Sequence, residues 1–252
     1  MRTLVIGIPL PHVSFDNYSF LSAPSFAEYP SIIVEMAAAS QVVEEVAAGS
    51  VEGRTYAGQP VVNGPTTARA FGLAELLAMR RRETERFLAR SGVLVAFAWP
   101  DVPHQDIQGL PEWRRYSWLR SPQGFRYQEH ILPGFGSQGV LPEDGPHPFS
   151  PYVETFGPRL AYRAYVDEEA PGFADYARVF ARSPGGAGVG VEFTLGEGRI
   201  ILLPPLARFE AERTELAQTL FECLERWQDR LSPQTPEWMR ADARPSGRKE
   251  LS

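Results

Sequence analysis

The chain has 252 residues, of which 43% are hydrophobic and 22% charged, so it is long and apolar enough to bury the core of one large domain. The formal net charge of −6 argues against nucleic acid or an acidic membrane as a partner, because nonspecific binding to either requires a basic protein surface. The single cysteine, Cys223, excludes a disulfide framework within the chain and argues against a thiolate zinc site.

The N-terminal sequence MRTLVIGIPLPH predicts a strand, because its apolar run is too short for a secretion signal with a cleavage site. No run of about 18 apolar residues occurs, so we expect no membrane span and a cytoplasmic location. Among the 25 basic residues only Lys249 is a lysine, and it lies in the polar C-terminal stretch. This distribution argues against a catalytic or Schiff-base lysine.

Three short, uninterrupted apolar runs indicate strands that are buried on both faces of a sheet. They are TLVIGI at 3–8, SIIVEM at 31–36 and VLVAFAW at 93–99. Helical patterns at 40–49 and 67–91 separate the second run from the third. Strands that alternate with helices in this way predict a parallel sheet with right-handed crossovers.

The C-terminal half predicts further strands, one hairpin and a last helix. The alternating stretches at 159–166 and 177–183 are typical of strands, and GVGVEFTLGEGRIILLPPL predicts a hairpin that turns at GEG. Residues 208–231 form an amphipathic helical pattern with Cys223 on the apolar face, so we expect a buried structural thiol. The polar stretch 232–252 predicts a flexible tail.

These patterns together predict an α/β fold in a single domain, residues 1–231. Its largely parallel, Rossmann- or flavodoxin-like sheet is flanked by helices and carries an antiparallel C-terminal hairpin. Stretches rich in glycine, proline or aromatic residues are expected to be loops, and they lie at 9–30, where one helical turn is expected near Ser25–Glu28, at 50–65 and at 100–150. The glycine-rich SPGGAGVG lacks the Gly-Lys-Ser/Thr of a phosphate loop and precedes its strand, so no cofactor is expected.

Three stretches resemble the class I glutamine amidotransferase-like group of α/β proteins. The first is FDNYSFLSAPSFAEYPSIIVE, which follows the first strand. In the second, TERFLARSGVLVAFAWP, a helix leads into a strand through a Ser-Gly turn, and the third, LGEGRIILLPPL, leads to the last helix. The similarity lies in the order of these elements, covers about half of the chain and leaves out residues 100–150.

Active members of that group carry a cysteine nucleophile on a tight turn after a strand, with a downstream His and Glu. Here the strand at 93–99 ends at Trp99 and is followed by Pro100 and Asp101, and Cys223 lies inside a predicted helix. No Gly-x-Ser-x-Gly elbow supplies a serine instead. The resemblance therefore implies a non-catalytic branch without the nucleophile, whose members would sense a ligand or bind a protein partner.

Polar residues near the ends of the predicted strands form a candidate ligand site, which we call the predicted rim. Asp16 and Asn17 come after the first strand, Glu35 ends the second, and Asp101 and His104 follow the third. The carboxyl ends of parallel strands gather ligands, so these side chains could bind a ligand, or serve a hydrolase or metal-assisted enzyme. The alternative is that they cap turns and helices.

The stretch 111–128 is basic and aromatic within an acidic chain. Four arginines, among them Arg114 and Arg115, are interleaved with five aromatic residues, among them Trp118. Such faces could stack on bases or bind an anionic ligand, which makes a nucleic-acid or nucleotide binder a third hypothesis. The alternative, which we favour, is that the aromatic side chains hold a long loop against the sheet while the arginines face water.

Overall fold

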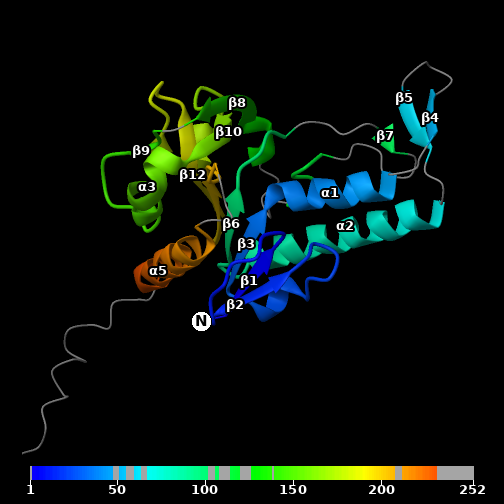
Figure 1. Ribbon diagram of the computed structural model, residues 1–252, viewed down its shortest axis with the longest axis horizontal. Helices are drawn as coiled ribbons and strands as arrows, with labels where there is room; N and C mark the ends of the chain where they lie inside the picture. The colour runs from blue at the N-terminus through cyan, green and yellow to red at the C-terminus, as the bar shows by residue number, and fades with distance from the viewer. Residues whose placement is uncertain are drawn as a thin grey trace, which may run out of the picture.

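The computed structural model describes residues 2–47, 51–54, 60–63, 67–101, 106–107, 114–119, 126–137, 139–207 and 212–231. Within these ranges the protein is a mixed α/β structure built on a ten-stranded sheet (Figure 1). A separate three-stranded sheet lies at the far end of two long helices, α1 and α2. The expected α/β class is thus confirmed.

Five adjacent strands of the large sheet are parallel, in the order β2-β1-β3-β6-β13. They are β1 (Thr3–Ile6), β2 (Phe15–Tyr18), β3 (Ser31–Glu35), β6 (Val93–Phe97) and β13 (Gly198–Leu203). The three strands expected to be buried neighbours, β1, β3 and β6, lie side by side, as predicted.

Their continuous apolar sequences arise because both faces of the sheet are covered. Along β6, Leu94 and Ala96 point into one hydrophobic core, whereas Val95 and Phe97 point into the other. Helices α1 (Met36–Ala47) and α2 (Thr67–Leu88) cover the first face, and α3 (Ser150–Phe156) and α5 (Arg213–Leu231) cover the second (Figure 1). Every side chain of the strand is therefore buried, which explains why apolar and polar residues do not alternate along its sequence.

The remaining strands of the large sheet are antiparallel, and they are more numerous than the single hairpin expected. They are β8 (Ile131–Ser137), β9 (Leu141–Pro142), β10 (Ala161–Val166), β11 (Ala177–Arg182) and β12 (Gly188–Leu195). The predicted hairpin is confirmed as β12–β13, where Leu195 pairs with Gly198 and Gly196 adopts a positive φ of 69°.

Three stretches predicted to be loops contain strands, and that part of the prediction is wrong. Residues 9–30 hold β2 besides the helical turn expected near Ser25–Glu28, which is the 3-10 helix η1 (Phe26–Glu28), and 100–150 hold β8 and the 3-10 helix η2 (Tyr127–His130). Residues 50–65 contribute β4 (Val51–Arg54) and β5 (Pro60–Asn63) to the small sheet, which β7 (Asp106–Ile107) completes. These strands depend on pairing with distant segments, which local composition does not encode.

Two shorter elements complete the chain order, the 3-10 helix η3 (Gly157–Arg159) and the one-turn helix α4 (Phe173–Tyr176).

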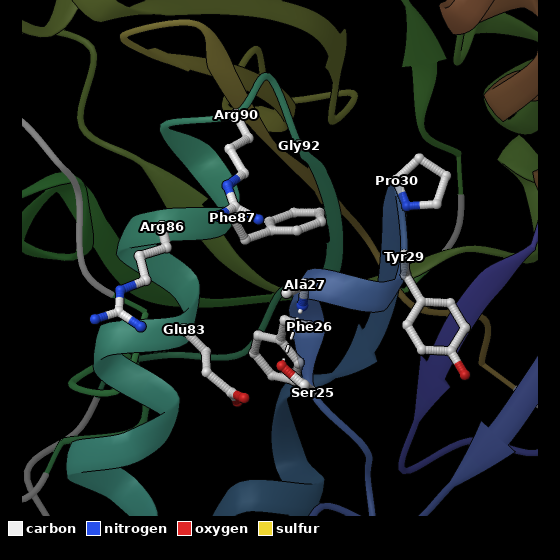
Figure 2. Close-up of a pocket in the computed structure, with 10 residues that line it drawn as sticks. All are labelled: Ser25, Phe26, Ala27, Tyr29, Pro30, Glu83, Arg86, Phe87, Arg90 and Gly92. Atoms are coloured by element: carbon white, nitrogen blue, oxygen red, sulfur yellow. Dashed lines mark hydrogen bonds between the residues drawn. The ribbon is translucent and has the colours of Figure 1, made fainter.

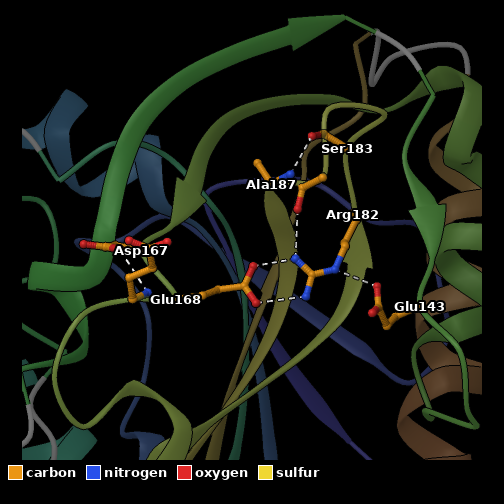
Figure 3. Close-up of polar contacts among 8 residues, drawn as sticks. Glu143, Asp167, Glu168, Arg182, Ser183 and Ala187 are labelled. Atoms are coloured by element: carbon orange, nitrogen blue, oxygen red, sulfur yellow. Dashed lines mark hydrogen bonds and ion pairs between the residues drawn. The ribbon is translucent and has the colours of Figure 1, made fainter.

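Arg182 at the end of β11 ties together three segments of the antiparallel half (Figure 3). Its guanidinium lies 2.7 Å from Glu143, 2.9 Å from Glu168 and 2.8 Å from the carbonyl oxygen of Gly186. Because these acceptors satisfy the guanidinium within the protein, the cluster is a structural clamp.

Cys223 is fully buried on α5, as expected from the helical pattern, and burial raises the pKa of its thiol to about 12. We expect a thiol reagent such as 5,5′-dithiobis(2-nitrobenzoate) to leave the native protein unmodified at neutral pH, because both the thiolate and a path to it are lacking. The control is the same chain in denaturant, which should react at once. Rapid labelling without unfolding would contradict the buried position.

None of the helices in the described part of the chain is long and apolar enough to cross a membrane.

Candidate functional site

Glu35 is the last residue of β3 and stands directly before α1, which begins at Met36 and not near residue 40 as predicted. One carboxylate oxygen, Oε1, accepts hydrogen bonds from the backbone N–H of Ala37, at 3.2 Å, and from the indole N–H of Trp99. The carboxylate thus satisfies a free N–H in the first turn of α1, which explains the early helix start.

The other carboxylate oxygen of Glu35, Oε2, is buried and has no hydrogen-bond partner among the described residues. Burial raises the pKa of Glu35 to about 7, although the bonds from Ala37 and Trp99 and the charges of Arg115 and Arg163 act in the opposite direction. A carboxyl group in this state can accept or donate a hydrogen bond near neutral pH.

Trp99 and Tyr116 fill the space just beyond the end of β6. The Tyr116 hydroxyl accepts a hydrogen bond from the backbone N–H of Trp99, at 3.1 Å, and donates one to its carbonyl oxygen, at 2.8 Å. Tyr116 is fully buried, and Trp99 is half-buried. The backbone groups that would be available to a ligand at this strand end are therefore bound by a side chain of the protein itself.

Two arginines lie against the indole ring of Trp99. Arg115 is 5.6 Å from the ring centroid and is held by Ser40 Oγ, at 2.9 Å, and by the carbonyl oxygen of Pro100, at 2.6 Å. Arg163, from β10, is 4.9 Å from the same centroid and 5.7 Å from that of Phe135, and it is exposed. Because the Arg163 guanidinium has no hydrogen-bond acceptor among the described residues, it retains donors for a ligand.

Asp101 adds an acidic side chain next to the backbone of Tyr116. Its buried carboxylate forms an ion pair with Nε of Arg114, at 3.1 Å, and its second oxygen lies 3.4 Å from the backbone N–H of Tyr116. Burial raises the pKa of Asp101, and the charge of Arg114 partly offsets that effect. Asp101 and Glu35 lie in the same neighbourhood, since Tyr116 binds the backbone of Trp99, whose indole donates to Glu35, and donates its own backbone N–H to Asp101.

Asp16 does not belong to this group, and its predicted convergence with Glu35 is wrong. It lies within β2, where the register aligns it with Leu4 and through Leu4 with Ile32, well before the end of β3. Its carboxylate is bound by Arg2, at 2.9 Å, and by the Tyr29 hydroxyl, at 3.1 Å. The hydrogen bond from Arg2 lowers the pKa of Asp16.

Asn17 and His104, the other two members of the predicted rim, add no ligand group here. The side chain of Asn17 closes the preceding loop through the backbone N–H of Leu10, at 2.7 Å, and its carbonyl oxygen, at 2.9 Å. His104 lies outside the described residues. Within the described ranges no group of three His, Cys, Asp or Glu side chains could hold a metal ion.

The aromatic residues of 111–128 that the structure describes belong to the core. Trp118 is fully buried and packs edge-on against Phe20 and Phe26, with centroid distances of 5.1 and 6.2 Å. Tyr116 and Tyr127 are equally buried, while Trp113 and Phe125 lie outside the described ranges. The faces that would have stacked on bases are therefore occupied by protein.

The arginines of the same stretch behave differently from one another. Arg114 is half-exposed, but Arg115 is buried, so the expectation that both face water is wrong for Arg115. Its guanidinium is compensated by Ser40, by a backbone carbonyl group and by the face of Trp99. Such compensation is what a buried arginine needs to avoid a large desolvation cost.

Sequence analysis missed Arg163 and Phe135, which complete the surroundings of Trp99. Alternation along β10 places Arg163 on an exposed face, but no local signal shows that this face lies beside Trp99. A second feature was also missed, a hollow of about 540 Å³ beyond the carboxyl ends of β1 and β2. It is lined by uncharged residues, including Gly7, Asn17 and Gln41.

A scan against family models and a search of curated proteins find no match to this chain. Among solved structures, a cytoplasmic protein from Salmonella typhimurium LT2 is similar with a TM-score of 0.47 and 12% identity, over 90% of this chain and 99% of that one. A β-galactosidase from Bacillus circulans sp. alkalophilus follows at a TM-score of 0.38 and 10% identity, over 88% of this chain and 31% of that one.

An exo-β-1,4-mannosidase from Opitutaceae bacterium strain TAV5 is similar at a TM-score of 0.30 and 11% identity, over 86% of this chain and 26% of that one. The chain thus spans about a third or less of the two glycosidase chains. At these TM-scores and identities the similarities indicate neither a family nor a function.

Proposed function

We propose that this protein is a non-catalytic domain that senses a small ligand or binds a protein partner. The observation that carries the proposal is the filled space beyond β6, where an enzyme of the amidotransferase-like group would hold its nucleophile. Trp99 stands at that position, and Tyr116 binds both of its backbone polar groups. A side chain that can attack a substrate is replaced by an indole ring and a neutral phenol.

The scaffold in this proposal is amidotransferase-like, with a Rossmann- or flavodoxin-like arrangement of its parallel strands. The order β2-β1-β3-β6-β13, with helices on both faces, supports that arrangement. In keeping with the net charge of −6, the proposed partner is a small molecule or a protein rather than nucleic acid, and the proposed location is the cytoplasm.

The ligand site in this proposal is the group around Trp99. Arg163 offers free guanidinium donors, and the rings of Trp99 and Phe135 offer apolar faces. A ligand with a negatively charged or strongly accepting group fits the arginine.

The test is thermal unfolding of the full chain with a panel of amino acids, sugars, dicarboxylates and phosphorylated sugars. A ligand held at about 100 times its Kd stabilises the folded state by about 2.7 kcal/mol, so one class should raise the melting temperature clearly. Arg163→Gln should abolish that rise, whereas Arg82→Gln on the exposed face of α2 should leave it unchanged. A panel without any Arg163-dependent stabilisation would contradict a small-ligand site around Trp99.

A second candidate is an acid–base enzyme, which the raised pKa of Glu35 favours, since perturbed carboxyl groups are common at active sites. Its site would be Glu35 and Asp101 without Asp16. Release of ammonia from glutamine, or hydrolysis of p-nitrophenyl acetate, distinguishes the two candidates. Turnover that Glu35→Gln abolishes would replace the non-catalytic proposal.

A further inference from the structure

A pocket of about 170 Å³ lies at the opposite end of the sheet from Trp99, at the amino ends of β3 and β6 (Figure 2). Pro30 and Gly92, the residues that precede these two strands, form part of its wall. The buried rings of Phe26 and Phe87 also line it. A cavity of roughly 150 Å³ is enough to hold benzene, so this pocket can take a compact apolar body.

Most polar side chains of this pocket already have partners. Ser25 Oγ accepts from the backbone N–H of Ala27, at 3.3 Å, and the Tyr29 hydroxyl donates to Asp16, at 3.1 Å. Glu83 is paired with Arg80, at 2.7 Å, and Arg80 is itself only 1% exposed. The one carboxylate in the wall is therefore neutralised and does not repel an anion.

Two arginines remain, one in the last turn of α2 and one just beyond the end of this helix at Leu88. Arg86 and Arg90 are exposed, line the pocket, and have no side-chain partner among the described residues. Figure 2 shows the side chain of Arg90 reaching beside the ring of Phe87, while Arg86, one turn earlier, is turned outwards. Cations near a helix C-terminus also interact favourably with its dipole, but that effect needs no pocket.

We infer that this pocket binds a small anion with a compact apolar body, such as an aromatic carboxylate or phosphate. The edge of Phe87 and the side chain of Ala27 receive the apolar body, Arg90 is the first anchor of the anionic group, and Arg86 turns inward as the second. The remaining free donors are guanidinium groups, which bind carboxylate and phosphate through paired hydrogen bonds. This site shares no residue with the group around Trp99, so the test of this inference does not depend on the proposed function.

The experiment titrates the full chain with benzoate, phenyl phosphate and the uncharged analogue benzyl alcohol, and follows binding by calorimetry. We expect at least one anion to bind and benzyl alcohol to bind at least about tenfold more weakly, because a hydrogen bond to a charged group is worth about 1.5–3 kcal/mol. Arg90→Gln should weaken the anion about tenfold, and Arg86→Gln should weaken it less.

Arg82→Gln is the matched control, since Arg82 is an exposed arginine on the same helix that does not line the pocket. It removes the same charge and should change the anion affinity by less than about twofold. Arg163→Gln should also leave binding here unchanged. Equal binding of benzyl alcohol, equal weakening by Arg82→Gln, or no binding of either anion would each overturn the inference.

Discussion

Replacing Trp118 by alanine is expected to lower the free energy of unfolding by about 3–5 kcal/mol. The side chain is fully buried and packs against the rings of Phe20 and Phe26, so its removal leaves a large cavity in the core. Urea unfolding followed by circular dichroism measures the change directly. If the variant does not fold, Trp118→Phe should be folded and less stable than the parent chain.

The matched control is Phe135→Ala, because Phe135 is an aromatic residue that remains 70% exposed. Its removal should change the stability by only about 0.5 kcal/mol. Equal effects of the two substitutions would show that Trp118 is not a core residue. Such a result would restore the hypothesis that 111–128 presents stacking surfaces to nucleic acid.

Glu35 is expected to make the stability of the protein fall between mildly acidic and mildly basic pH. Its pKa rises from 4.5 to about 7 on folding, so the folded state binds a proton that the unfolded state has released. This contribution is fully present below about pH 4.5 and is lost as the pH passes through 7. Each unit of pKa shift corresponds to about 1.4 kcal/mol, so the full loss should reach about 3–4 kcal/mol, of which about 2–3 kcal/mol falls between pH 5 and pH 8.

The measurement compares the parent chain with Glu35→Gln in urea at pH 5 and at pH 8. Glutamine keeps an oxygen that can accept from Ala37 and Trp99 but does not titrate. The parent chain should therefore lose about 2–3 kcal/mol relative to the variant between the two pH values. Asp101, whose pKa is also raised, is present in both proteins and cancels in the comparison.

Glu129→Gln is the control, since Glu129 is an exposed carboxylate paired with the exposed Arg126. Exposed pairs contribute little, so its difference from the parent chain should stay within about 1 kcal/mol at both pH values. A Glu35→Gln difference that is flat with pH would mean that the carboxylate is solvated. The site around Trp99 would then lack its buried polar group.

The sequence by itself determined the strands and helices whose signal is local. The apolar runs of β1, β3 and β6 and the apolar face of α5 that holds Cys223 are confirmed. The helix predicted over 67–91 exists but ends at Leu88, and Ser91 rather than the predicted Gly92 adopts the positive φ that follows it. Each follows from periodicity or from one backbone requirement. At Gly92, for example, a Cβ atom would come within 2.6 Å of the Phe87 carbonyl oxygen.

Only the tertiary structure decided which polar side chains meet. Asp16 was expected beside Glu35 because a loop was expected after β1, but pairing of Phe15–Tyr18 with β1 moves it towards the amino end of the sheet. Arg163 and Trp99 are far apart in sequence and come together only through the pairing order of the sheet. Burial of Arg115 likewise depends on Ser40 of a different element. Local patterns specify which residues form strands, whereas long-range pairing determines the neighbours of each strand end, and so the composition of the site.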